Sequence, residues 1–130
     1  MLGIKKIFKG KKKILLVEDD AMLSSVLASH LEKEGFAVEK VLNGLEVIDK
    51  TKKFLPDLIL LDLILPGLDG FEVLRQLKDD EKMSDIPVVV LSNLDKEEDV
   101  KSTIAMGAKE HVVKVKTKLE DIIKIVNRNI

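Results

Sequence analysis

The chain has 130 residues, a length that suits one compact domain with a single hydrophobic core. Its composition, 45% hydrophobic and 35% charged, is typical of a soluble globular protein, and the absence of cysteine excludes disulfides, thiolate catalysis and zinc–thiolate sites. No apolar run reaches the roughly 20 residues that a membrane-spanning helix needs. We therefore expect a cytoplasmic protein.

Basic residues are concentrated at the N-terminus. Six of the 22 Lys and Arg residues lie within residues 1–13, so the rest of the chain has 16 basic against 23 acidic residues and a net charge of about −7. We predict a basic leader over residues 1–12 and one domain over residues 13–130. The acidic domain argues against nucleic acid as a partner. The leader mixes apolar residues with lysines, as in segments that contact a membrane surface, but we favour a solvated terminus for so short a segment.

From Lys13 onward, short apolar runs alternate with helical patterns. Residues 14–17 predict a first strand, and the helix after it ends at Gly35. The inward face of that helix is expected to comprise Leu23, Val26, Leu27 and Leu31. Residues 37–42 predict a second strand, followed by a turn at Asn43-Gly44. Leu45 and Ile48 begin a second amphipathic helix, which must end before Pro56.

The second half of the chain repeats this alternation. Residues 58–61 are apolar without interruption, which predicts a strand buried on both faces, with Asp62 at its end. Further strands are expected at residues 87–91 and 111–115. The inward helical faces should include Phe71, Leu74 and Leu77; Val100, Thr103 and Ile104; and Leu119, Ile122, Ile123 and Val126. Capping boxes are expected at Asp69 with Glu72, Asp95 with Glu98, and Thr117 with Glu120.

This order, five strands each followed by a helix, predicts an α/β fold. Such a (βα)5 chain forms a doubly wound five-stranded parallel sheet with helices on both faces. Right-handed crossovers place the carboxyl ends of all the strands along one edge. In open sheets of this kind, ligands bind outside those ends.

Polar residues follow four of the five strands and should converge at that edge. They are Glu18-Asp19-Asp20, Asp62, Ser92-Asn93 and Lys114. Crowded carboxylates repel one another, and Mg²⁺ with its preference for oxygen ligands would offset that repulsion. A lysine and a hydroxyl group add donors for phosphoryl oxygens. Each residue has an ordinary alternative role, such as a helix cap for Asp20, but their joint placement favours phosphoryl chemistry with Mg²⁺.

At these residues the sequence resembles the receiver domains of response regulators in two-component signalling. The resemblance covers about residues 12–128, and the segments that carry it are ILLVEDD (14–20), PDLILLDLILPGLDG (56–70), IPVVVLS (86–92) and GAKEHVVK (107–114). An acid pair, an Asp before a Pro-Gly-x-Asp-Gly loop, a hydroxyl residue and a Lys, in this order, are jointly specific. The resemblance implies a flavodoxin-like receiver fold.

The resemblance also implies roles for single residues. Asp62 corresponds to the phosphoacceptor, which attacks a phosphohistidine and becomes an acyl phosphate. Asp19 is expected to be a direct Mg²⁺ ligand, Glu18 to act through water, and the backbone carbonyl of Ile64 to complete the protein ligands. Lys114 is expected to pair with a phosphoryl oxygen.

Three further residues belong to the implied switch. Ser92 is expected to swing toward the phosphoryl group, with the Asn93 N–H nearby. His111 stands where the family usually has an aromatic switch residue, and the alternative is a surface histidine without that role.

Partners implied by the resemblance are a sensor histidine kinase or a histidine phosphotransfer protein, and a downstream target. The target would bind the face formed by the fourth helix, fifth strand and fifth helix. Because the sequence ends after the last helix, signalling should proceed through binding rather than as an enzyme.

The chain departs from the family pattern at three places. Val115 stands where many members have proline, so the cis peptide common there is in doubt. Ile64 and Leu94 are apolar where the family lines the approach of hydrolytic water, which predicts a long phosphorylated lifetime.

The alternative function is a pseudo-receiver that binds partners without phosphorylation, which the intact acid, hydroxyl and lysine set argues against. An aspartate-based phosphohydrolase would need a second Asp at Ile64, and a Rossmann domain a glycine-rich turn after the first strand.

Overall fold

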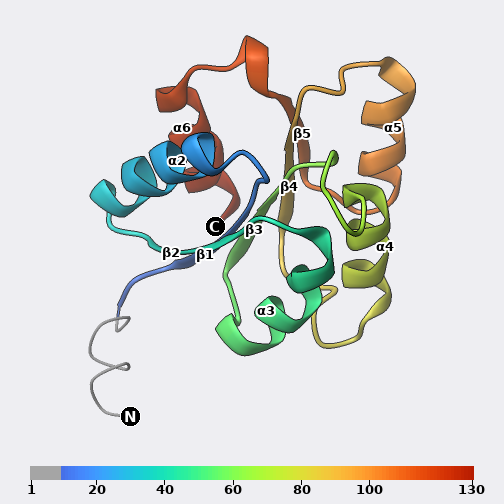
Figure 1. Ribbon diagram of the computed structural model, residues 1–130, viewed down its shortest axis with the longest axis horizontal. Helices are drawn as coiled ribbons and strands as arrows, with labels where there is room; N and C mark the ends of the chain where they lie inside the picture. Colours follow the sequence, from blue (N-terminus) through green and yellow to red (C-terminus); the bar gives the residue numbers. More distant parts are fainter. Residues whose placement is uncertain (1–9) are drawn as a thin grey trace.

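The computed structural model describes residues 10–130 as one α/β sandwich (Figure 1). Residues 1–9, which make up most of the expected leader, lie outside the described residues. The strands are β1 (Lys13–Val17), β2 (Ala37–Val41), β3 (Leu58–Leu61), β4 (Val88–Ser92) and β5 (Glu110–Val113). They form one parallel sheet in the order β2-β1-β3-β4-β5, which confirms the predicted doubly wound fold.

Within residues 10–130, five α-helices cover the two faces of the sheet (Figure 1). They are α2 (Ala21–Lys33), α3 (Val47–Phe54), α4 (Gly70–Asp79), α5 (Glu97–Ala105) and α6 (Leu119–Asn129), with the 3₁₀ turns η1 (Gly44–Glu46) and η2 (Lys114–Lys116). α2 and α6 pack on one face, and α3, α4 and α5 lie on the other. No helix within residues 10–130 is long and apolar enough to cross a membrane.

Two hydrophobic cores, one on each side of the sheet, follow from the alternation of side chains along the strands. In β1, Ile14 and Leu16 belong to the core under α2 and α6, whereas Leu15 and Val17 belong to the core under α3 and α4. All four are at most 1% exposed. Burial of such side chains stabilises the fold by roughly 1.5–3 kcal/mol each.

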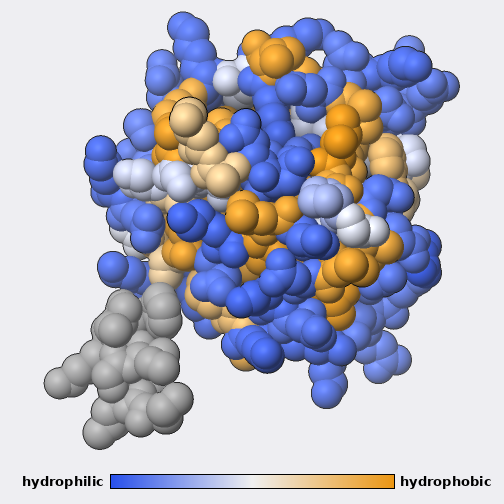
Figure 2. Space-filling view, in the orientation of Figure 1, coloured by the Kyte–Doolittle hydropathy of each residue, from blue (hydrophilic) through white to orange (hydrophobic). Residues whose placement is uncertain are grey.

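Some residues predicted to face the core are exposed instead. Val26 and Ile104 are 45% exposed and Leu45 is 65% exposed. Successive residues on a helix lie about 100° apart, so the burial of Leu27 and Thr103 turns their neighbours Val26 and Ile104 outward. Leu45 lies in η1, before the first turn of α3. Exposed apolar residues of this kind form separate patches on an otherwise largely hydrophilic face (Figure 2).

Of the three predicted capping boxes, only the Asp69 cap forms, and Glu72 does not complete a box there because its carboxylate pairs with Arg75. The Asp69 carboxylate accepts a hydrogen bond from the Glu72 N–H at the start of α4. The N-caps of α5 and α6 are Lys96 and Lys118, one residue later than predicted, and neither makes a side-chain cap bond. Ion pairing competes with capping at α5, because Asp95 lies 3.6 Å from the Lys116 ammonium. At α6 the competitor is the backbone, because the Thr117 hydroxyl donates to the Val113 carbonyl.

The fifth strand is also shorter than predicted. It ends at Val113, and Lys114 begins the turn η2. This early end matters for the site, because the turn takes Lys114 off the extended strand path at the carboxyl edge. Within residues 10–130 all peptide bonds are trans, including the one between Lys114 and Val115.

Candidate functional site

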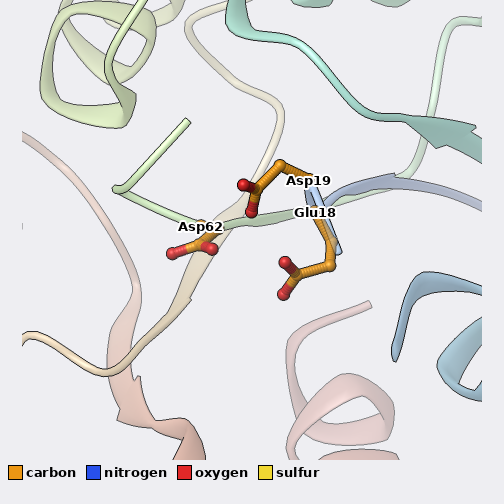
Figure 3. A group of neighbouring side chains, drawn as sticks. All are labelled: Glu18, Asp19 and Asp62. Carbon is orange, nitrogen blue, oxygen red and sulfur yellow. The ribbon is translucent and has the colours of Figure 1, made fainter. Parts of the chain in front are cut away.

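Three carboxylates meet at the carboxyl edge of the sheet (Figure 3). Val17 and Leu61 are register partners on the adjacent strands β1 and β3, so the residues that follow them, Glu18 and Asp62, emerge side by side. One carboxylate oxygen each from Glu18, Asp19 and Asp62 lies within 4.8 Å of the other two. The structure therefore gathers acids from residues 18 and 62, which are 44 positions apart in the chain.

Lys114 supplies the positive charge at this edge. Its ammonium group donates to Asp62 Oδ2 over 2.8 Å and also to Glu18 Oε1. Glu18 and Asp62 are only 2% and 5% exposed, and β5 brings the lysine to them from the far side of β4. Without a partner, such buried charges would cost several kcal/mol each. One lysine thus partly neutralises two buried acids, and the group of four side chains keeps a net negative charge.

Burial and pairing shift the pKa values of this group. Burial raises the pKa of the Glu18 carboxyl, and the hydrogen bonds from Lys114 and the Asp20 N–H only partly oppose it. For Lys114, burial disfavours the charge, but hydrogen bonds to Asp62 and Glu18 outweigh it and raise the pKa of the ammonium group. The lysine is therefore held protonated, as a donor to phosphoryl oxygens must be.

The three carboxylates differ in how free their oxygens are. Glu18 uses Oε1 for Lys114 and Oε2 for the Asp20 N–H, 3.0 Å away. Asp62 uses Oδ2 for Lys114 and Oδ1 for the Ile64 N–H at 3.3 Å. Asp19 is exposed, and within residues 10–130 its carboxylate makes no hydrogen bond or ion pair. An oxygen-only donor set of this kind fits Mg²⁺, with Asp19 the freest ligand.

The hydroxyl and amide residues after β4 lie in the connection to α5. Ser92 is fully buried, and its Oγ accepts a hydrogen bond from the Leu94 N–H over 3.3 Å. Asn93 is exposed, and its side-chain oxygen accepts from the Val115 N–H. The Asn93 side chain thus links the β4–α5 connection to the turn that carries Lys114. From the sequence, only the Asn93 N–H was expected to belong to the site.

His111 is not a surface histidine without contacts. On β5 its ring nitrogens contact the Thr103 hydroxyl of α5 and the Leu94 carbonyl. Thr103 was not predicted to be a polar partner, because its spacing fitted an inward helical face. His111 is therefore half-buried and hydrogen-bonded at both ring nitrogens, and its switching role stays a prediction.

Two glycines, Gly44 and Gly70, keep the loop after Asp62 in place. The sequence pattern predicted only a turn at Gly44. The Gly44 N–H donates to the Pro66 carbonyl over 3.0 Å. A Cβ added at Gly44 would lie 1.7 Å from the Leu68 carbonyl oxygen, and one at Gly70 would lie 2.3 Å from the Asp62 carbonyl oxygen. Only glycine permits this close approach, so the β2–α3 connection packs directly on the loop that carries Ile64.

Comparison with known proteins agrees with this fold. Residues 14–127 match the family model "Response regulator receiver domain". PilH of Pseudomonas aeruginosa is 34% identical over 115 residues, which are 88% of this chain and 94% of PilH. The phosphate regulon regulator PhoB of Rhizobium meliloti is 38% identical over 102 residues, 78% of this chain, but the match spans only 45% of PhoB.

Solved structures give the same result. The chemotaxis protein CheY4 of Vibrio cholerae superposes with a TM-score of 0.86 at 25% identity, covering 93% of this chain and all of that one. The BeF₃-activated receiver domain of Klebsiella pneumoniae RstA superposes with a TM-score of 0.84 at 29% identity, covering 91% and 97%. The chain belongs to the response-regulator receiver domain family. Receiver domains are signalling phosphoacceptors that bind Mg²⁺ and interact with histidine kinases and downstream targets, and they are not classical enzymes.

Proposed function

We propose that this chain accepts a phosphoryl group on Asp62 from a phosphohistidine and binds a partner differently as a result. The donor would be a sensor histidine kinase or a histidine phosphotransfer protein. The observation that carries the proposal is the pairing of the buried Asp62 with Lys114 beside Glu18 and the free Asp19. A lysine paired with this acid can also donate to a phosphoryl oxygen, and the neighbouring Asp19 keeps its oxygens free for a cation.

The chain's own residues would divide the reaction as follows. An Asp62 oxygen attacks phosphorus, the bond from phosphorus to the histidine nitrogen breaks, and the donor imidazole leaves with that electron pair and takes up a proton. Lys114 exchanges its contact with Asp62 for one with a phosphoryl oxygen. Ser92 turns from the Leu94 N–H toward the phosphoryl group. Bound Mg²⁺ would offset negative charge on the phosphoryl oxygens.

The metal would be held by Asp19, Asp62 and the Ile64 carbonyl, with Glu18 acting through water. The contrast between Glu18, whose oxygens accept from Lys114 and the Asp20 N–H, and the exposed Asp19, which has no such contact within the described residues, supports Asp19 as a direct ligand. The response regulator Rcp1, which is 32% identical and covers 90% of both chains with a TM-score of 0.76, has been solved in a Mn²⁺-bound form. That relative supports a divalent cation as a ligand of this chain.

The signal would leave through the face formed by α5, β5 and α6. This face contains His111, whose contacts reach back to the connection that follows Ser92. A downstream protein that binds this face more tightly in one state than the other would shift the equilibrium between them.

Intact-mass spectrometry after incubation with acetyl phosphate and Mg²⁺ tests the proposal. We expect addition of one phosphoryl group that requires Mg²⁺ and is lost in Asp62→Asn. The matched control is Asp20→Asn, because Asp20 only caps α2 and asparagine caps equally well. If the wild type stays unmodified, both there and with a competent phosphohistidine donor, the chain is instead an interaction module that works without phosphorylation.

A further inference from the structure

Both nitrogens of the His111 ring are engaged, and they join two separate segments. Nδ1 lies 2.8 Å from Thr103 Oγ1 on α5, and Nε2 lies 2.7 Å from the Leu94 carbonyl oxygen in the β4–α5 connection. A carbonyl oxygen only accepts hydrogen bonds, so Nε2 must carry a proton. In the neutral ring, Nδ1 then accepts the proton of the Thr103 hydroxyl. We call these two hydrogen bonds the His111 tie.

The Leu94 peptide carries the tie to the phosphoacceptor site. Its carbonyl accepts from His111, while its N–H donates to the Ser92 hydroxyl over 3.3 Å. If Ser92 turns toward a phosphoryl group on Asp62, this peptide loses its bond to Ser92 and keeps only the one to His111. The position of the connection then depends on the ring.

Thr103 anchors the other end of the tie. It is fully buried on α5, and its hydroxyl also lies 3.1 Å from the Val100 carbonyl oxygen within the same helix. Because a hydroxyl has one proton, it cannot donate to His111 and Val100 at once. The contact to the ring therefore competes directly with a bond internal to α5.

We propose that His111 is a positioning residue that ties the β4–α5 connection to α5 through both ring nitrogens. Departure of the Ser92 hydroxyl then moves a hydrogen-bonded unit, Leu94 with His111 and Thr103, instead of releasing a ring that rotates by itself. The link to phosphorylation rests on the proposed function, whereas the tie itself exists without it. A phenylalanine at this position would fill the same space and could make neither bond.

Three substitutions separate the parts of the tie. His111→Phe keeps an aromatic ring and removes both hydrogen bonds. Thr103→Val keeps the side-chain shape and removes only the α5 anchor. His111→Gln offers an amide N–H at a position close to that of Nε2 and so should restore the bond to Leu94. The matched control is His30→Gln, because His30 is an exposed residue on α2.

Amide hydrogen exchange in the unphosphorylated protein is the first readout. We expect exchange at residues 94–96 to rise about fivefold in His111→Phe, the effect of one lost net hydrogen bond, and to return toward wild type in His111→Gln. His30→Gln should change nothing there. Equal protection of residues 94–96 in wild type and His111→Phe would overturn the tie, whatever the outcome of phosphorylation.

Nitrogen-15 spectra of the imidazole rings are the second readout, and the chain has only two histidines. We expect His111 to carry its proton on Nε2 and its Nδ1 signal to shift in Thr103→Val. A ring protonated on Nδ1 alone would contradict the assigned contacts. Phosphorylation of Asp62 should then shift the α5 amides in wild type and at least fivefold less in His111→Phe. Equal shifts of the α5 amides in wild type and His111→Phe would show that the tie does not couple phosphorylation to α5. If the proposed function fails, the wild type itself will carry no phosphate.

Discussion

Ile64 and Leu94 stand two residues after Asp62 and Ser92, on either side of the proposed phosphoryl group. The Ile64 side chain is 58% exposed, so it makes little contribution to the core and is free to cover the approach to Asp62. Leu94 is half-buried, and its backbone, not its side chain, makes the bonds to Ser92 and His111. Apolar side chains at both positions cannot orient an attacking water by hydrogen bonding.

We therefore predict that Ile64→Asn and Leu94→Glu each shorten the lifetime of the phosphorylated protein. A polar group able to orient water should speed hydrolysis by about tenfold, equivalent to ~1.4 kcal/mol of barrier. The measurement is loss of the phosphoryl mass with time after removal of the donor. The control is Ile104→Asn, an exposed isoleucine on α5. Rapid loss in wild type that neither substitution accelerates would contradict this view.

Leu55 is strained by its backbone. With φ 53°, it is the one non-glycine residue between 10 and 130 in the left-handed region, and it ends α3. The conformation costs a branched residue roughly 1–2 kcal/mol, while glycine adopts it freely. Its side chain is 65% exposed, so little burial offsets that cost.

We predict that Leu55→Gly stabilises the protein by about 0.5–1 kcal/mol, after the higher chain entropy of glycine in the unfolded state is counted. Urea unfolding measures the change. Leu45→Gly is a close control, because Leu45 is also 65% exposed but has an ordinary backbone conformation. It should lose stability by a similar amount. A loss of stability in both Leu55→Gly and Leu45→Gly would show that glycine relieves no strain at position 55.

At the scale of elements, the C-terminal end of α6 is fastened to β5. Arg128 donates to both carboxylate oxygens of Glu110, and the Asn129 amide donates to the same group over 2.6 Å. The hydrogen bond from Arg128 lowers the pKa of the Glu110 carboxyl, with burial opposing it. Because the pKa of Glu110 is lower in the folded state, this contact stabilises the fold at pH values above 4.5, the usual pKa of a glutamate.

The stabilisation by Glu110 should therefore disappear as pH falls from about 4.5 through its lower folded pKa. We predict that Glu110→Gln destabilises the protein by about 0.5 kcal/mol at neutral pH, a small value because the pair is partly exposed, and that the difference shrinks in acid. Urea unfolding at a series of pH values checks this. Glu81→Gln, at an exposed residue outside the helices, should show no such trend. A difference independent of pH would mean that shape, not charge, is lost.

At the scale of the whole molecule, the proposed metal binding at the acidic edge would raise stability. Asp62 lies beside Glu18 and Asp19 only in the folded chain, since it follows β3 and they follow β1. A cation bound there stabilises the folded state by an amount set by its concentration, about 2.7 kcal/mol at one hundred times the dissociation constant.

We predict that Mg²⁺ raises the melting temperature of wild type and that Asp19→Asn abolishes most of the increase, because Asp19 is the freest ligand. Differential scanning calorimetry with and without a chelator measures both. Asp49→Asn, an exposed acid on α3, should respond like wild type. An undiminished response in Asp19→Asn would place the cation elsewhere.

Much of the fold could be predicted because its signals are local. The uninterrupted apolar run of β3 required burial on both faces, and the alternation of strands and helices required a parallel sheet. Helix ends were harder. Lys96 and Lys118 became N-caps although Asp95 and Thr117 have better capping side chains, because those side chains found partners outside the helix.

The sequence by itself determined that the strands form a parallel sheet and which polar residues stand at their carboxyl ends. Both follow from patterns among residues that are near one another in the chain. Only the tertiary structure decided which groups touch. The Lys114 ammonium reaches Glu18 as well as Asp62, Gly44 supports the loop after Asp62, and Thr103 holds His111. These contacts join residues on different elements, and their selection depends on burial and on competition for single protons and lone pairs, which no local pattern encodes.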